Sequence, residues 1–191
     1  INDFQPNDYL IWYYNVKYFN QWSQMCGGSY SSDYTGQTEN GGQGSQYIAT
    51  LNYRNKIQQY IDQTGTVENN GFLAATGIMT IYLAIFDTDM YGSIPYTEAA
   101  HYDDKGILTP KYEKVEDLYD LWIEELNNYI TMLQAGDLVS FKGQDAAYGC
   151  DWKKWARFAN SLKLKIAARL YNNEPAKAMQ LVEEAASNKA G

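Results

Sequence analysis

Residues 71–86 read GFLAATGIMTIYLAIF, a run in which apolar residues occupy nearly every position around a helix. A helix that is apolar on all sides is buried, either in a protein core or in a membrane. The run is shorter than the roughly 20 residues that span a bilayer, and it contains two Thr and two Gly. We therefore predict a buried central helix over residues 67–91, with Gly77 allowing a second helix to approach closely.

Amphipathic segments flank this central helix in the sequence. Between residues 115 and 133, apolar side chains such as Leu118, Trp122 and Leu126 recur at steps of three and four, which predicts a helix with one apolar face. The same reading, with helix start and stop signals, predicts four more helices, over residues 7–25, 47–63, 152–171 and 174–187. No segment alternates with a period of two, so the predicted fold class is all-α.

The predicted helices form hairpins. Residues 167–185 read AARLYNNEPAKAMQLVEEA, which resembles the joint between two helices of a tetratricopeptide repeat. We expect a tetratricopeptide-like arrangement in which 47–63 pairs with 67–91, and 152–171 pairs with 174–187.

Two long irregular segments separate the helices. Residues 26–46 contain six Gly and many small polar residues, and residues 91–111 contain Pro95 and Pro110, a composition typical of loops. Loops of this length without secondary structure are often functional. The second loop is rich in apolar residues, so we expect it to pack against the helices.

Composition narrows the classes of function. The 191 residues carry a formal charge of −8 and include 18 Tyr, 5 Trp and 6 Phe. An acidic surface repels a phosphate backbone, so we predict no nucleic-acid partner. The single His101 and the two distant cysteines, Cys26 and Cys150, cannot supply a four-ligand zinc site, and we predict no metal and no cofactor. The two cysteines form either one bridge or two free thiols.

No catalytic constellation emerges from the sequence. Neighbouring carboxylates, such as Asp103 with Asp104, point in different directions and are most simply solvated charges. The common hydrolase, nucleotide-binding and zinc-protease signatures are absent from the 191 residues. We therefore predict that the protein is not an enzyme.

Tyrosines in or beside the loops are the candidate ligand contacts, because Tyr offers a flat apolar face and a hydroxyl. A sugar ring needs such a face together with amide and carboxylate partners. The candidate tyrosines are Tyr30, Tyr34, Tyr47, Tyr91, Tyr96 and Tyr102. We predict a ligand site on the Gly-rich loop, formed by Tyr30, Asp33, Tyr34, Asn40, Gln43 and Tyr47. In the alternative interpretation these tyrosines only hold the loops to the helices, or the loop contacts a transporter.

Three strings of the sequence are distinctive: DTDMYGSIPYTEA at 87–99, YEKVEDLYDLWIEELN at 112–127 and WKKWARFANSLKLKIAARL at 152–170. In order and spacing they resemble the SusD/RagB family of glycan-binding outer-membrane lipoproteins of Bacteroidetes. The first contains a loop similar to the family's YGxIPYxEA motif. The third is similar to its WxxFANSLKLRxxxR helix, with Lys165 where the family usually has Arg. Within this helix we expect Asn160 to be partly buried and hydrogen-bonded to the backbone of a neighbouring loop, such as the IPY segment.

The resemblance implies a tetratricopeptide-like fold without catalysis. It also implies a lipid anchor at the cell surface of the outer membrane, and a SusC-like TonB-dependent transporter as the partner that receives the captured glycan. The anchoring Cys and the family's large C-terminal portion are not in this chain, so we expect residues 1–191 to be one helical domain of a longer SusD-like protein. The alternative hypothesis is a helical-repeat scaffold that binds a protein or peptide, and a weaker one is a helical carbohydrate-active enzyme.

Overall fold

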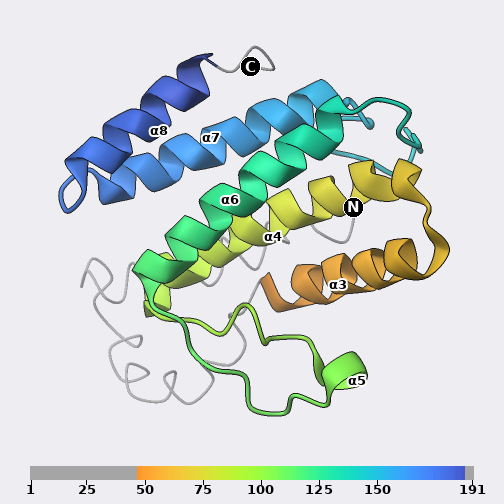
Figure 1. Cartoon of the computed structure of the whole chain (residues 1–191), viewed down its shortest axis with the longest axis horizontal. Helices are drawn as coiled ribbons and strands as arrows, with labels where there is room; N and C mark the ends of the chain where they lie inside the picture. The colour runs from red at the N-terminus through yellow and green to blue at the C-terminus, as the bar shows by residue number, and fades with distance from the viewer. Residues whose placement is uncertain (1–46, 188–191) are drawn as a thin grey trace, which may run out of the picture.

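Helices build the structure of residues 47–187, the part of the chain that the computed structural model describes (Figure 1). In chain order they are α3 (Tyr47–Thr64), the 3-10 turn η5 (Val67–Asn69), α4 (Asn70–Tyr91), α5 (Tyr102–Lys105), α6 (Val115–Gln134), α7 (Trp152–Leu170) and α8 (Pro175–Ser187). Between residues 47 and 187 there is no strand, only an isolated bridge between Ile94 and Glu113. The all-α prediction is confirmed. The predicted helix at 7–25 and the Gly-rich loop at 26–46 lie outside the described residues.

The central position belongs to α4, as its apolar sequence predicts. It packs against α3, α6 and α7, and Figure 1 shows it between α3 and the pair α6 and α7. The segment 67–91 is long and apolar enough to cross a membrane, but 78% of its most apolar window is buried inside the protein. That burial is the property of a core helix. The predicted single helix differs only in its first turn, which is the 3-10 turn η5.

Gly77 lets α6 approach α4 closely, as predicted. A Cβ atom placed on Gly77 would overlap the ring of Tyr129, which lies on α6. Tyr129 is 6% exposed and Ile78 beside Gly77 is fully buried. The absence of a side chain at one position therefore allows a large aromatic ring to fill the space between the two helices.

Helices that follow one another along the chain lie against each other. α3 packs on α4, α6 on α7 and α7 on α8 (Figure 1), so the two predicted hairpins are present. The first is closed at Gly65, which has a φ of 70° and donates its N–H to the carbonyl of Ile61 at 2.8 Å. Glycine adopts this left-handed conformation without steric cost. The stacking of the two hairpins as tetratricopeptide repeats stays a prediction.

A buried carboxylate organises the connection from α6 to α7. Asp145 is 3% exposed and accepts backbone N–H groups of Ala147, Tyr148 and Cys150 at 2.8–3.1 Å. It also accepts the indole N–H of Trp155 at 2.8 Å. Burial alone raises the pKa of Asp145. The hydrogen bonds together lower it by more than burial raises it, so the pKa of Asp145 lies below its ordinary value. Cys150 in this turn is a buried free thiol.

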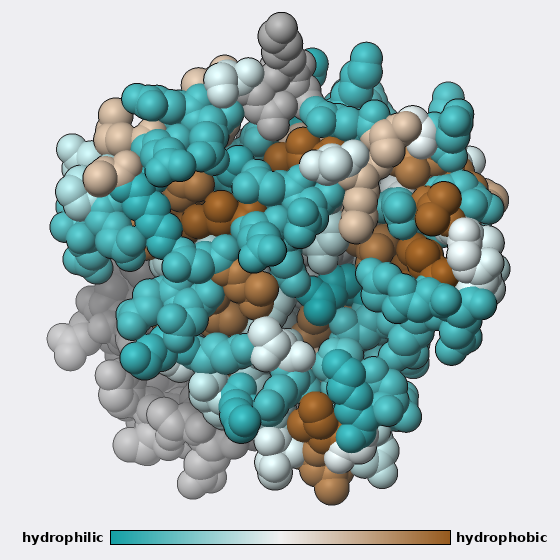
Figure 2. Space-filling model, in the orientation of Figure 1, coloured by the Kyte–Doolittle hydropathy of each residue, from teal (hydrophilic) through white to brown (hydrophobic). Residues whose placement is uncertain are grey.

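The surface in the view of Figure 2 is largely hydrophilic, with apolar side chains in small separate groups. Several of the most exposed large residues belong to the connection between α4 and α6, among them Tyr102, Leu108 and Tyr112. This connection is the aromatic-rich loop that the sequence predicts.

Candidate functional site

The loop over residues 92–114 joins α4 to α6 and carries the IPY string. Ile94, Tyr96 and Ala99 are each less than 5% exposed, so the loop packs down on the helices as predicted. Tyr96 is a core residue. Its ring contacts Trp122 of α6 edge-on, with centroids 5.5 Å apart.

Partly buried hydrogen bonds hold this loop to α3 and α6. The Tyr96 hydroxyl donates to Glu125 at 2.8 Å and accepts from Arg54 at 3.1 Å. Arg54 also pairs with Glu125 at 3.1 Å. Burial raises the pKa of Tyr96 well above its ordinary value, with the Glu125 charge acting in the same direction. Burial also raises the pKa of Glu125, while Arg54 and the Tyr96 hydroxyl oppose that rise. The three groups form one compact cluster.

Glu113 closes the loop from the other side. Its carboxylate accepts the backbone N–H groups of Tyr96 and Thr97 at 2.7 and 3.0 Å, as well as the Thr97 hydroxyl. Its own N–H donates to the carbonyl of Ile94 at 3.0 Å. The two ends of the loop are thereby tied together. The IPY segment also bonds α3, through Tyr47 and Arg54. Asn160 is buried on α7 at 6% exposure, and its bond to the IPY segment stays a prediction.

A second polar chain positions α5 on α3. The Asn55 oxygen accepts from the Arg54 guanidinium at 3.1 and 3.3 Å. Its nitrogen therefore faces the Ala100 carbonyl and His101 Nε2, at 3.4 and 3.3 Å. Nε2 then accepts, and the Nδ1–H of His101 donates to Asp104 at 2.8 Å. Both ring nitrogens of His101 are bonded, one to Asn55 of α3 and one to Asp104 of α5. These bonds fix the start of α5 relative to α3.

Beside this chain lies a hollow of about 250 Å³ between α3 and α5. Ile48, Ala49 and Asn52 of α3 line one side, and Ala100, Tyr102 and Asp103 line the other. Tyr102 is 62% exposed. Within residues 47–187, the side chains of Asn52 and Asp103 form no hydrogen bond or ion pair. We call this feature the Tyr102 hollow.

The Tyr102 hollow combines an exposed ring, an amide and a carboxylate over a small apolar floor. An aromatic face can stack against the C–H face of a ring-shaped polar molecule. The amide donates and accepts hydrogen bonds, and the carboxylate accepts them. This set of groups can therefore bind a molecule that is apolar on one face and carries hydroxyls at its rim.

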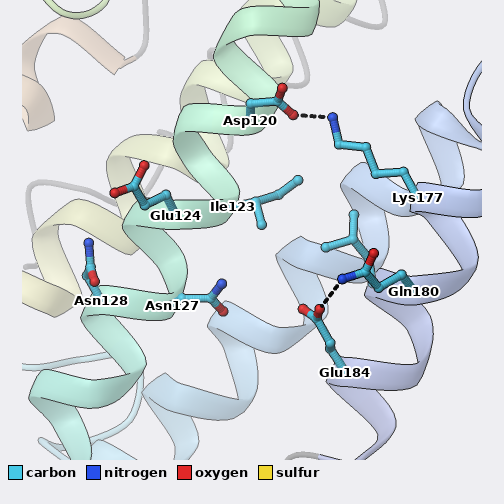
Figure 3. Close-up of a pocket in the computed structure, with 9 residues that line it drawn as sticks. Asp120, Ile123, Glu124, Asn127, Asn128, Lys177, Gln180 and Glu184 are labelled. Atoms are coloured by element: carbon cyan, nitrogen blue, oxygen red, sulfur yellow. Dashed lines mark hydrogen bonds and ion pairs between the residues drawn. The ribbon is translucent and has the colours of Figure 1, made fainter.

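A second hollow lies between α6 and α8 and holds about 400 Å³ (Figure 3). Lys177 of α8 reaches across to Asp120 of α6, and Gln180 bonds Glu184 along α8 at 2.9 Å. The other lining residues are Ile123, Glu124, Asn127, Asn128 and Leu181. No aromatic residue lines this groove, so it offers polar contacts without a stacking platform.

The predicted site residues are only in part within the described structure. Tyr30, Asp33, Tyr34, Asn40 and Gln43 lie outside it. Tyr47 is 2% exposed, its hydroxyl donates to the carbonyl of Pro95, and its ring stacks on Tyr96 with centroids 6.2 Å apart. Burial raises the pKa of Tyr47 above its ordinary value. Tyr47 therefore holds α3 to the loop and does not line the Tyr102 hollow.

The sequence singles out Tyr102 as a loop aromatic but gives no signal for Asn52, which looks like any polar residue on a helix surface. Neighbouring carboxylates diverge as expected: Glu124 lines the groove between α6 and α8, whereas Glu125 binds Arg54. Among residues 47–187 no three His, Cys, Asp or Glu side chains gather to hold a metal ion.

Comparison with protein families matches residues 12–191 to the SusD-like family described as "Starch-binding associating with outer membrane". Solved structures with a similar fold include a SusD homolog from Parabacteroides distasonis, at 29% identity and a TM-score of 0.64 over 75% of this chain. A chitin-binding protein is 32% identical, with a TM-score of 0.57 over 74% of the chain. A chitin-binding SusD homolog from Flavobacterium johnsoniae is 25% identical, with a TM-score of 0.60 over 71%.

The matched region is a minor part of these larger proteins. It corresponds to 27%, 31% and 28% of their respective chains, so this chain spans less than a third of the length of each. A search of the curated proteins finds no match.

Proposed function

The chain belongs to the SusD-like family, and we propose that it acts as part of a non-catalytic surface protein that captures glycans and delivers them to a TonB-dependent transporter of the SusC type. The family description, starch-binding in association with the outer membrane, supports this role. So do the chitin-binding proteins among the similar structures.

The observation that carries the proposal is a rigidly held loop that displays aromatic rings. Residues 92–114 are fixed by Glu113 and by the Arg54, Tyr96 and Glu125 cluster. The same loop exposes Tyr102 by 62% and Tyr112 by 73%. Holding a binding surface in place before the ligand arrives lowers the entropy lost on binding. Exposed tyrosines on a fixed loop therefore suit the capture of sugar chains.

Affinity electrophoresis through gels that contain soluble starch or a soluble chitin derivative tests this function. We expect slower migration of the chain in one of these gels than in a gel without polysaccharide. Intact oligosaccharides after long incubation, measured by a reducing-end assay, are expected of a protein without catalysis. Unchanged migration in a full panel of glycan gels would contradict glycan capture.

The Gly-rich loop remains a proposed part of the glycan site, through Tyr30, Tyr34, Asp33, Asn40 and Gln43. A stacked aromatic contributes on the order of 1 kcal/mol, so loss of both tyrosines should weaken binding by about tenfold or more. Calorimetry on the Tyr30→Ala/Tyr34→Ala double variant measures this. Unchanged affinity with intact folding would remove the loop from the site.

Delivery and anchoring are proposals that need the complete protein. We expect a lipid-anchored outer-membrane protein that co-purifies with a SusC-like transporter.

A second candidate function, a scaffold that binds a peptide, is favoured by the polar groove between α6 and α8, whose amides match the donors and acceptors of a peptide backbone. A peptide pull-down alongside the glycan gels separates the two.

A further inference from the structure

We propose that the Tyr102 hollow is a subsite for one neutral sugar unit, with Tyr102 as the stacking platform and Asn52 and Asp103 as hydrogen-bonding partners. This inference rests on the proposed function and deepens it, because it assigns a place and a class of glycan. The lining residues of the hollow differ from those proposed on the Gly-rich loop.

The ring of Tyr102 is available for stacking. By contrast, Tyr96 on the same loop is buried against Trp122 and Tyr47. Tyr102 makes no ring contact within residues 47–187 and is 62% exposed. Helix α5 has only four residues and no buried side chain. Core packing therefore does not explain why a large aromatic residue stands at this position.

Asn52 and Asp103 supply the directional contacts. Vicinal hydroxyls on a sugar both donate and accept hydrogen bonds, so they need partners of both kinds. The Asn52 amide offers a donor and an acceptor, and the Asp103 carboxylate offers acceptors. Neither side chain is occupied by another described residue. The two come from opposite walls of the hollow, α3 and α5, and can contact hydroxyls on two edges of one ring.

The two walls are held together before any ligand binds. Asn55, one turn of α3 beyond Asn52, bonds the Ala100 carbonyl and His101. His101 in turn bonds Asp104. These contacts flank Tyr102 and Asp103 on both sides in the sequence, so the platform and its polar partners keep their spacing.

The charge of the lining selects neutral sugars. Asp103 is the one charged residue among those that line the hollow, and it is negative. The cations nearest to it in sequence, Arg54 and Lys105, do not line it. A uronic acid or sulfated sugar would bring a second negative charge next to Asp103 and be repelled. We therefore expect neutral oligosaccharides to bind more tightly than acidic ones of equal length.

The experiment is calorimetric titration of the full chain with maltohexaose and chitohexaose as neutral probes and a hexauronate as the acidic probe. Tyr102→Ala should weaken binding of the better neutral probe by about tenfold, whereas Tyr102→Phe, which keeps the ring, should retain most of it. Asn52→Ala should weaken binding several-fold. Asp103→Asn should reduce the preference for the neutral probe over the hexauronate.

Tyr60→Ala is the matched control, because Tyr60 is 53% exposed on α3 and does not line the hollow. The affinity of this control variant for the neutral probe should equal that of the wild type. If Tyr102→Ala and Asn52→Ala bind like the wild type and keep its melting temperature, the subsite is wrong while glycan capture stands. Equal losses of affinity in Tyr102→Ala and Tyr60→Ala would also overturn the location. Equal affinity for acidic and neutral probes would overturn the charge selection. A wild-type chain that binds no glycan at all would overturn the proposed function itself.

Discussion

The helices and the connections between them are ordered by different physical means. α4 and α6 are held by apolar packing, with Ile78, Trp122 and Leu126 fully buried. The connections are held by carboxylates that accept several hydrogen bonds: the partly buried Glu113 and Glu125 fix residues 92–114, and the buried Asp145 fixes the turn before α7. Apolar packing tolerates many side chains of similar volume, whereas a carboxylate with several donors tolerates almost no replacement. Order in a loop can therefore depend on fewer residues than order in a helix.

Among substitutions in the connections between helices, Asp145→Asn should lower the free energy of unfolding the most. A buried carboxylate that accepts four hydrogen bonds becomes an amide that places an NH₂ group against donors, at a cost of about 4 kcal/mol in the free energy of unfolding. Chemical denaturation at pH 7 measures it. Exposed Asp103→Asn is the control and should change stability by less than about 0.5 kcal/mol.

The same variant predicts a pH dependence. Because the pKa of Asp145 is lowered in the folded protein from 3.8, its contribution to stability is complete above that value and is lost as the pH falls through the folded pKa. The stability difference between the wild type and Asp145→Asn should therefore shrink below pH 3.8. A difference that stays constant down to pH 2 would contradict the role of the ionised carboxylate.

Arg54→Met should come next, at about 3 kcal/mol, because it leaves the largely buried Glu125 without its cation. Urea denaturation gives the value. If the cost arises from the stranded charge, adding Glu125→Gln should recover a large part of it. Costs that simply add in the double variant would argue against a coupled pair.

Gly77→Ala tests the apolar packing between the helices α4 and α6. The added methyl group overlaps the Tyr129 ring, and overpacking of this kind costs about 1 to 3 kcal/mol, reduced by the roughly 1 kcal/mol gain in helix propensity. We expect a net loss of up to about 2 kcal/mol in the free energy of unfolding, measured by thermal denaturation. Gly143→Ala, where a Cβ atom meets nothing, is the control and should be nearly neutral.

Tyr102→Ala should have the smallest effect on stability, within about 0.5 kcal/mol, because the ring is exposed. Its melting temperature, measured beside that of Tyr112→Ala, checks this. A large destabilisation would show that Tyr102 is a packing residue and not a displayed one.

The sequence predicts the helices well and the connections poorly, for the same physical reason. Leu118, Trp122 and Leu126 recur at helical spacing within one short segment, so the local pattern contains the structure. The bond between Arg54 and Glu125 joins residues 71 positions apart, and no local pattern pairs them.

The candidate site shows the same limit. Tyr102 is recognisable in the sequence as a loop aromatic. Asn52 is a candidate site residue only because α5 folds back onto α3 and places Tyr102 and Asp103 opposite it. Tyr47 and Tyr96 look like displayed loop tyrosines but are buried, since the sequence does not show how tightly residues 92–114 close on the helices. The one-turn helix α5 is also too short for periodicity to detect.

The contact between Gly77 and Tyr129 has an evolutionary consequence. Neither position can change size alone, since a side chain at 77 needs the space that the ring at 129 fills. Substitutions at the two positions should therefore occur together in related proteins, with a larger residue at 77 accompanied by a smaller one at 129. An alignment of SusD-like sequences should show this pair as correlated columns, and the lineages that changed only one of the two should be rare.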